Sequence, residues 1–240
     1  MSFEIIYADP AWSYDDKATA GDRGAAFKYP VMSVEDICAL DVQAHTAPDC
    51  ACFMWATPPC LPEAFQVMAA WGFKYSTIAF VWVKTRSVRI AEARRVVRGR
   101  LPGLAPRADG IVDELAAEGL ITSKLHIGMG QSTRANAEIV LLGTRGKLNR
   151  ADAGVRQVVM APLGQHSAKP PEVRERIVRL LGDRPRLEMF ARDRAPGWSI
   201  WGNQAPGGSD VEIGVRGDRL VTPAPPAADP RQVAIFDVLA

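Results

Sequence analysis

The residues with the clearest chemical potential are Asp9, Pro10 and Trp12, which follow a short apolar stretch at 3–8. A carboxylate accepts hydrogen bonds, and the carbonyl of a proline held in a stiff turn is a second acceptor. An indole offers a flat face for stacking. This combination suits a planar base whose exocyclic amine carries two N–H donors, once the base has left its stack. The alternative is a turn that ends a strand and places a tryptophan in the core.

A second chemical feature is a run of basic residues between 84 and 107, interrupted by one acid, Glu92. The basic residues are Lys84, Arg86, Arg89, Arg94, Arg95, Arg98, Arg100 and Arg107. The net charge of the whole chain is only +2, so this run is a candidate binding surface for a polyanion such as nucleic acid. A solvated helix face is the alternative.

The elements that must position these residues alternate between strands and helices over the first two hundred residues. Apolar runs predict strands at 3–8, 50–56, 77–83, 138–142, 186–191 and 198–201. Helical patterns follow the N-cap residue Ser33, occupy 62–71, and begin again at Pro170, with Gly182 as the stop. The alternation predicts an α/β fold with an open, mostly parallel sheet. Ligands bind at the carboxyl ends of such strands, where Asp9 and Arg192 stand.

Two regions depart from this alternation. Residues 85–127 read as an insertion with two helical pieces, around 88–98 and 110–119. After residue 204 the chain becomes rich in proline and glycine and loses its periodicity. We therefore expect one domain over 1–204 that contains the basic insertion, followed by a flexible tail at 205–240.

Composition excludes several classes of protein. With 240 residues, 48% hydrophobic and 23% charged, the chain is typical of a globular protein. Its longest uninterrupted apolar run, 50–56, is far shorter than the roughly 20 residues of a membrane span. The N-terminus shows no secretory signal. The four cysteines, too few for a disulfide framework, are expected as buried reduced thiols without a metal. We therefore expect a cytoplasmic protein.

A series of motifs resembles the adenine-N6 methyltransferases typified by the catalytic subunit of the eukaryotic mRNA adenosine methyltransferase. That family's Asp-Pro-Pro-Trp hallmark is matched by Asp9-Pro10-Ala11-Trp12. Further matches, in the family's order, are Tyr29-Pro30-x-Met32-Ser33-x-Glu35, Phe80-Val81-Trp82-Val83-Lys84, Gly128-Met129-Gly130 through Leu141-Leu142-Gly143, His166-Ser167-x-Lys169-Pro170, Glu188-Met189-Phe190-Ala191-Arg192, and Gly197-Trp198 with Gly202-Asn203-Gln204. The resemblance spans 3–204 apart from the insertion.

The resemblance implies a fold, an activity and a cofactor. The fold would be the Rossmann-like sheet of S-adenosylmethionine-dependent methyltransferases, seven-stranded and mostly parallel with one antiparallel strand. The activity would be methylation of the N6 amine of adenine in nucleic acid, with S-adenosyl-L-methionine as the cofactor and no metal. Asp9 and the Pro10 carbonyl would hold the amine, and Trp12 completes the catalytic set.

The resemblance also assigns binding roles to residues further along the chain. Lys169 would bind the methionine carboxylate of the cofactor and Asp9 its ammonium, while Tyr29 lies on a loop that closes over the methionine. Glu188 and Arg192 would bond to the ribose hydroxyls, and Asn203 and Gln204 would meet the adenine. The predicted nucleic-acid-binding residues are Lys84, Arg86, Arg94, Arg95, Arg98, Arg100 and Arg134.

One departure from the family keeps a different function open. Ala11 replaces the second proline of the hallmark, so the loop is less stiff although both hydrogen-bond acceptors remain. The alternative to an active enzyme is a catalytically inactive, nucleic-acid-binding subunit of the same fold. A methyltransferase for small molecules or proteins is a third interpretation. A homodimer or a pairing with a second subunit is also left open.

The end of the chain carries a further motif. Gln232-Val233-Ala234-Ile235-Phe236 resembles the short peptides by which bacterial DNA enzymes dock on the replication sliding clamp. Gln232 would set the register, and Ile235 with Phe236 would be the buried anchor. The alternative is a last strand that packs on the domain. Docking on the clamp would favour DNA slightly over RNA as the substrate.

Overall fold

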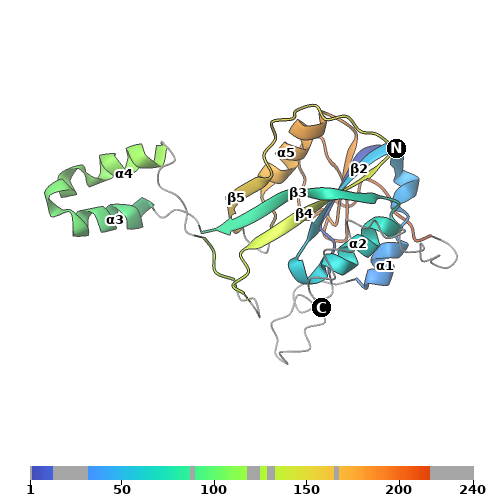
Figure 1. Ribbon diagram of the computed structural model, residues 1–240, viewed down its shortest axis with the longest axis horizontal. Helices are drawn as coiled ribbons and strands as arrows, with labels where there is room; N and C mark the ends of the chain where they lie inside the picture. The colour runs from blue at the N-terminus through green and yellow to red at the C-terminus, as the bar shows by residue number, and fades with distance from the viewer. Residues whose placement is uncertain are drawn as a thin grey trace, which may run out of the picture. The chain divides into compact units, whose positions relative to one another are not determined.

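The computed structural model describes residues 2–12, 32–86, 90–117, 125–128, 133–164 and 168–216 (Figure 1). Tyr29, the His166-Ser167 pair and the docking motif at 232–236 lie outside the described residues. The chain divides into two compact units. Unit 1 comprises Met1–Ala79, Ile139–Ala153 and Val178–Ala240, and unit 2 comprises Phe80–Glu138 and Gly154–Ile177.

Seven strands of the described chain form one sheet in the order β5-β3-β4-β2-β1-β6-β7. They are β1 (Phe3–Ala8), β2 (Thr46–Ala56), β3 (Lys74–Thr85), β4 (Ala137–Arg145), β5 (Val158–Pro162), β6 (Arg186–Met189) and β7 (Ser199–Trp201). The pairs β1–β2, β1–β6, β6–β7 and β3–β5 are parallel, whereas β2 and β4 are antiparallel. The expected mostly parallel α/β sheet with an antiparallel strand is confirmed.

The centre of unit 1 is strand β1, which lies between β2 and β6 and is parallel to both. Residues 50–56 of β2 are buried without a gap, which is why the sequence shows a continuous apolar run there and not an alternating one. Side chains of β1 and β2 join one hydrophobic core cluster with buried residues of the following helices. Burial of this surface holds the strand ends in place.

Helices α1 (Val34–Ala39) and α2 (Leu61–Ala70) lie side by side (Figure 1). Ser33 begins α1 as predicted, because its hydroxyl accepts a hydrogen bond from the Asp36 N–H at 3.0 Å. The Trp71 indole donates to the Ile37 carbonyl at 2.9 Å and so fixes the end of α2 against α1. Short 3-10 helices at Val42–His45 and Pro58–Cys60 precede β2 and α2.

Strand β5 was not predicted from the sequence. It has only five residues, of which Val159 and Ala161 are buried while Val158, Met160 and Pro162 are exposed. Such a short alternation is a weak signal. What defines the strand is its parallel pairing with β3, together with a hydrogen bond of 3.0 Å from the Trp82 indole to the Ala161 carbonyl.

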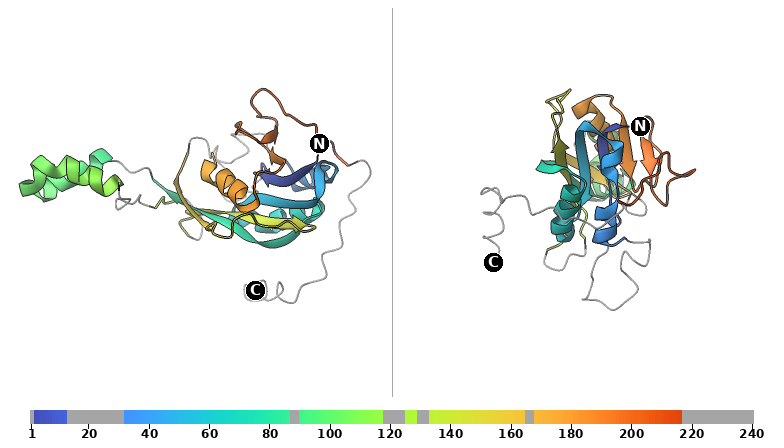
Figure 2. Two further views of the ribbon diagram at one scale, coloured as in Figure 1. Left: turned by 90° about the horizontal axis from the view of Figure 1, so that it is seen from above. Right: turned by 90° about the vertical axis from the view of Figure 1, so that its right-hand side faces the viewer.

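The insertion in unit 2 forms a helical hairpin of α3 (Ile90–Arg100), a 3-10 turn at Pro102–Arg107 and α4 (Ala108–Ala117). The two helices lie side by side (Figure 1), and the hairpin is seen again in the left view of Figure 2. Both predicted helical pieces are therefore present, displaced by about two residues from the expected bounds. Ion pairs join them, from Arg94 to Asp109 and Asp113 and from Arg98 to Asp109.

The chain after residue 204 remains attached to unit 1 as far as residue 216. Asp41 N–H donates to the Gly214 carbonyl at 2.9 Å, and Arg216 N–H donates to the Ala39 carbonyl at 3.0 Å. The Arg216 side chain also donates to the Ala70 carbonyl at 2.6 Å. Gly214 and Arg216, which belong to the segment expected as a tail, are thus bonded to the chain at the end of α1, and 217–240 lie outside the described residues.

The four cysteines are free and buried, as expected. Burial raises the pKa of the Cys50 thiol to about 12. Within the described chain, none of the helices combines the length and the apolar character required to cross a membrane.

The glycine that ends the last helix can be tested by substitution. Helix α5 (Pro171–Leu181) buries Val173 and Ile177, and Gly182 follows it with φ +86°. An added Cβ would find space there, since its nearest neighbour is 3.6 Å away, but the backbone conformation disfavours it. We expect Gly182→Ala to lower the free energy of unfolding by roughly 1 kcal/mol in urea denaturation.

Gly110→Ala is the matched control for this measurement. Gly110 lies in α4 with no other atom within 4 Å of an added Cβ, and its φ is not positive. A helical glycine tolerates alanine, so this variant should not lose stability. Equal stability of Gly182→Ala and the unaltered protein would contradict the role given to the helix stop.

Candidate active site

The carboxyl ends of β1 and β6 bring together two predicted site residues, Asp9 and Arg192. The two strands pair in parallel register with Ala8 opposite Met189, so the residues that follow each strand lie at the same edge of the sheet. There the Arg192 guanidinium donates from Nη2 to Asp9 Oδ2 at 3.1 Å. Both side chains are partly exposed, 21% for Asp9 and 30% for Arg192, so the pair faces solvent as a ligand site requires.

The chain bends sharply between β6 and Arg192. Phe190 has φ +60°, the one positive φ among the described non-glycine residues. A bulky residue in this conformation is strained and needs support from its surroundings. The Phe190 ring packs edge-on against Trp201 with ring centroids 5.4 Å apart, and the Ala191 N–H donates to the Trp201 carbonyl at 3.0 Å. These contacts with β7 hold the bend that brings Arg192 to Asp9.

Glu188 lies in the middle of the three neighbouring strands of unit 1. In register it stands opposite Tyr7 of β1 and Ile200 of β7, and it is only 7% exposed. A carboxylate at such a position is costly unless it is bonded, so its presence indicates a purpose. Glu188 is thus a buried acid within the sheet and not a surface charge.

Asn203 and Gln204 follow β7 and are exposed. The residue before them, Gly202, allows the loop to pass close to the bend after β6. A Cβ at this position would lie 2.9 Å from the Ala191 nitrogen and 3.1 Å from its carbonyl oxygen. A glycine is therefore required for this close approach.

Trp12 is placed differently from the expectation of an open stacking face. Its ring is 6% exposed and belongs to the hydrophobic core cluster, and its indole N–H donates to the Trp55 carbonyl at 3.3 Å. The Trp12 backbone N–H donates to the Pro10 carbonyl at 2.8 Å. The alternative left open by the sequence, a turn with a core tryptophan, describes this side chain, and the Pro10 oxygen keeps a second lone pair for another donor.

A second group of charged residues lies within unit 2. Glu138, at the start of β4, accepts from Lys84 Nζ at 2.5 Å through Oε1 and from Lys169 Nζ at 3.0 Å through Oε2. All three side chains are largely buried, between 13% and 18% exposed. Burial opposes ionisation of Glu138, but the charges of Lys169 and Lys84 outweigh it and lower its pKa. Two cations around one anion leave the group with a net positive charge.

Sequence reasoning assigned no role to Glu138. The available signal was an acid at the start of the apolar run Ile139–Leu142, where a carboxylate is as unexpected as Glu188 is in β6. Lys84 was assigned to nucleic acid, and the structure places its ammonium against Glu138 beside Lys169.

The remaining basic residues fall into two sets. Arg94 and Arg98 have acidic partners on α4 within the hairpin. The other predicted nucleic-acid-binding residues that the structure describes have exposed side chains; they are Arg86, Arg95, Arg100 and Arg134.

The fold and these groups define a class of protein. A mostly parallel α/β sheet with a carboxylate and a guanidinium at the carboxyl ends of adjacent strands is typical of α/β proteins that bind ligands at that edge. Comparisons with known proteins place the chain within this class.

Residues 3–97 and 118–204 match the MT-A70 family. The chain belongs to the MT-A70 family of adenine-N6 methyltransferases, which confirms the resemblance seen in the motifs. The unmatched residues between the two segments, 98–117, cover the end of α3, the turn and α4. This part of the hairpin is thus an addition to the family's domain.

Individual relatives agree with this assignment. The chain is 29% identical to the Type II methyltransferase M.MunI of Mycoplasma sp. over 90% of its own length and 83% of that protein. It is 26% identical to a probable N(6)-adenosine-methyltransferase MT-A70-like protein of Oryza sativa subsp. japonica and 25% identical to one of Arabidopsis thaliana. It spans only 27% and 25% of the length of these plant proteins.

The Lys84–Glu138–Lys169 group gives a prediction about stability and pH. Glu138→Gln removes the charge that two buried ammonium groups share, and we expect it to cost about 1–3 kcal/mol of unfolding free energy at pH 7. Because folding lowers the pKa of Glu138, its contribution is present above the ordinary value of 4.5 and is lost as the pH falls through the lower folded value. The difference between the two proteins in urea denaturation should therefore close in acid.

Glu175→Gln is the control, since Glu175 is an exposed carboxylate on α5. It should change the free energy of unfolding little at either pH. A Glu138→Gln deficit that stays constant from pH 7 to acid would contradict the ionic role of Glu138.

Proposed function

We propose that this protein transfers a methyl group from S-adenosyl-L-methionine to the N6 amine of adenine in nucleic acid, with DNA slightly favoured over RNA. The observation that carries the proposal is the position of Asp9, at the carboxyl end of β1 and bonded to Arg192, in a chain of the MT-A70 family. The chain covers 83% of the length of a Type II methyltransferase but only about a quarter of the plant proteins. This coverage supports a methyltransferase similar to the first of these relatives.

The residues fit the charge pattern of that cofactor. Its carboxylate suits Lys169, whose group with Glu138 and Lys84 carries one positive charge in excess. Its ammonium suits the Asp9 carboxylate, and its ribose hydroxyls suit the buried Glu188 and the guanidinium of Arg192. Asn203 and Gln204 offer amides for the adenine edge. S-adenosylmethionine supplies an activated methyl group on a sulfonium.

The protein's own chemical task is then small and specific. Asp9 and the Pro10 carbonyl accept hydrogen bonds from the target amine, which favours a more tetrahedral nitrogen with an available lone pair. The same acceptors stabilise the positive charge that develops on that nitrogen, and Asp9 is a carboxylate to which the nitrogen's proton can pass. Holding the amine in line is worth more than any acid–base step, because the reacting centres no longer have to find each other.

The nucleic-acid surface of the hairpin is proposed on Arg95 and Arg100, because Arg94 and Arg98, although also accessible, are engaged in ion pairs with acids of α4. Arg94 and Arg98 hold the hairpin together through Asp109 and Asp113. The exposed Arg95 and Arg100 of α3 carry charge that is available to phosphates. The basic run therefore contains two kinds of arginine, those that stabilise the hairpin and those proposed to bind phosphates.

The proposal predicts a loss of activity at Asp9. Asp9→Ala should reduce the rate of methyl transfer by about a hundred- to a thousandfold, because it removes one of two acceptors for the amine. The measurement is single-turnover transfer from labelled S-adenosylmethionine to matched DNA and RNA, followed by nucleoside analysis.

Asp41→Ala is the control for this experiment. Asp41 is also a carboxylate of unit 1 paired with an arginine, at 3.6 Å from Arg216, but it lies between α1 and β2. It should retain most of the activity. Near-normal turnover by Asp9→Ala would defeat the assignment. An unaltered protein that binds nucleic acid but neither binds nor uses S-adenosylmethionine would instead favour the inactive subunit, the function that Ala11 keeps open.

If Arg95 and Arg100 bind phosphates while Arg94 and Arg98 hold the hairpin, two double variants of equal charge should differ in how their nucleic-acid affinity depends on salt. Arg95→Ser/Arg100→Ser should flatten the log–log slope of nucleic-acid affinity against salt by about 0.7–0.9 for each phosphate that is no longer neutralised. Arg94→Ser/Arg98→Ser should change the slope less and lower the helicity of the hairpin, because it breaks the ion pairs with α4. The measurement is fluorescence anisotropy over a salt series.

Equal slopes for both double variants would contradict the division between structural and binding arginines. Slopes identical to that of the unaltered protein would exclude the hairpin from the nucleic-acid surface. Two predictions about partners remain predictions. One is docking on a sliding clamp through Gln232, Ile235 and Phe236, and the other is assembly with a second subunit.

A further inference from the structure

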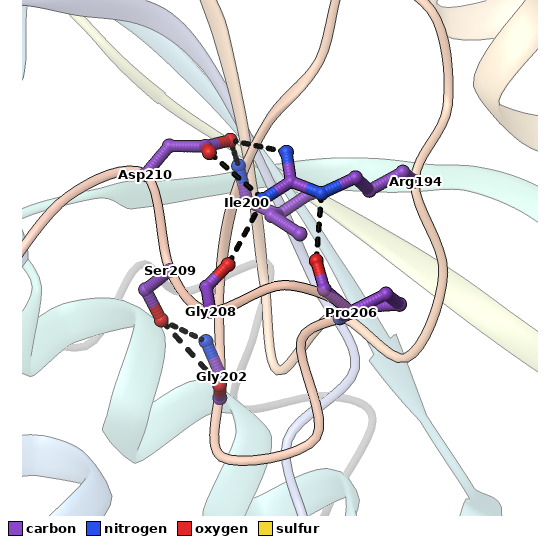
Figure 3. A network of polar contacts seen from close by, with 7 residues as sticks. All are labelled: Arg194, Ile200, Gly202, Pro206, Gly208, Ser209 and Asp210. Carbon is purple, nitrogen blue, oxygen red and sulfur yellow. Dashed lines mark hydrogen bonds and ion pairs between the residues drawn. The ribbon is translucent and has the colours of Figure 1, made fainter.

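The loops that follow β6 and β7 are tied together by one side chain, Arg194 (Figure 3). Its guanidinium forms a two-point ion pair with Asp210, from Nη1 to Oδ2 at 3.1 Å and from Nη2 to Oδ1 at 3.0 Å. It also donates from Nε to the Pro206 carbonyl at 2.7 Å and from Nη2 to the Gly208 carbonyl at 3.0 Å. An arginine fork used in this way fixes both position and direction.

Asp210 extends the connection into the sheet. Its Oδ2 accepts from the Ile200 N–H at 2.9 Å, and its own N–H donates to the Ile200 carbonyl at 2.8 Å. The hydrogen bond from Arg194, supported by the one from Ile200, lowers the pKa of Asp210. Asp210 is therefore bonded to the middle of β7 through one backbone hydrogen bond and one side-chain hydrogen bond.

A second contact, between Ser209 and Gly202, joins the two ends of the loop that follows β7. The Ser209 hydroxyl accepts from the Gly202 N–H at 3.1 Å and lies 3.4 Å from the Gly202 carbonyl (Figure 3). Gly207 and Gly208 adopt positive φ angles of +74° and +89°, which allow the chain to turn back. The segment 202–210 is thus anchored at both ends.

This network encloses the residues proposed to bind the nucleoside half of the cofactor. Asn203 and Gln204 lie between the anchored Gly202 and Pro206. Arg192, which bonds to Asp9, is two residues before Arg194. These loops are exposed, so packing alone does little to order them and hydrogen bonds must do so.

We propose that Arg194 and Asp210 are positioning residues of the cofactor site, which order Arg192, Asn203 and Gln204 before the cofactor binds. The inference rests on the proposed function, because it assigns these loops to S-adenosylmethionine. Ordering the loops in advance removes an entropic cost from binding and leaves the chemical step at Asp9 unchanged. The effect belongs to cofactor affinity and not to turnover.

The test compares three variants with the unaltered protein. Arg194→Ala removes the network, Asp210→Asn removes its charge, and Arg194→Lys keeps the charge but loses the fork. We expect Arg194→Ala to raise the KM and the dissociation constant for S-adenosylmethionine about tenfold, with kcat within about twofold. Arg194→Lys should recover part of the affinity. Hydrogen exchange at the Ile200 amide reports whether its bond to Asp210 is still present.

Arg179→Ala is the matched control, because Arg179 also forms an exposed ion pair in unit 1, with Asp152 at 2.5 Å. It should leave the KM and kcat unchanged. An Arg194→Ala protein with normal KM and affinity, or one that loses kcat and thermal stability at normal KM, would overturn the positioning role. Absence of S-adenosylmethionine binding by the unaltered protein would overturn the proposed function together with this inference, so the two failures are distinguishable.

Discussion

The parallel pairing of β1 with β6 is the constraint on which the site in unit 1 depends. With Ala8 opposite Met189, the first residues beyond the two strands come out at one edge of the sheet, although about 180 positions separate them in sequence. A shift of the register by one residue would turn Glu188 to the other face and move Asp9 away from Arg192. Strand β6 is buried throughout and pairs with β1 on one side and β7 on the other, which holds this register.

Acidic side chains in both units are paired with basic ones. Asp9 is bonded to Arg192, and Glu138 is shared by Lys84 and Lys169. The Asp9–Arg192 pair is partly open to solvent, so its Coulomb energy is moderate. The Lys84–Glu138–Lys169 group is largely buried, so the attraction between its charges is stronger. Asp210 serves differently, since it joins Arg194 to the backbone of β7 at Ile200.

The arginines of this chain show why the number of charges is a poor guide to their use. In the hairpin, Arg94 and Arg98 form ion pairs with acids of α4, although Arg98 is as exposed as Arg95 and Arg100 of the same helix. Arg192 and Arg194 stand two residues apart, yet one bonds to Asp9 at the strand end and the other bonds to the loop after β7. The direction of each side chain decides its role, and that direction follows from the local backbone.

The sequence by itself determined the order and type of most elements, the strand end at Asp9 and the family, because these depend on local patterns of apolar residues, caps and motifs. Ser33, Gly182 and the apolar run of β2 are examples in which neighbouring residues suffice. It did not determine β5, the burial of Trp12, the bend at Phe190, or the partners of Glu138 and Arg194. Those depend on contacts between distant segments: β5 exists through its pairing with β3, and Glu138 takes its role from two lysines brought to it by the fold. Only the tertiary structure decided them, because long-range pairing selects partners that no local pattern names.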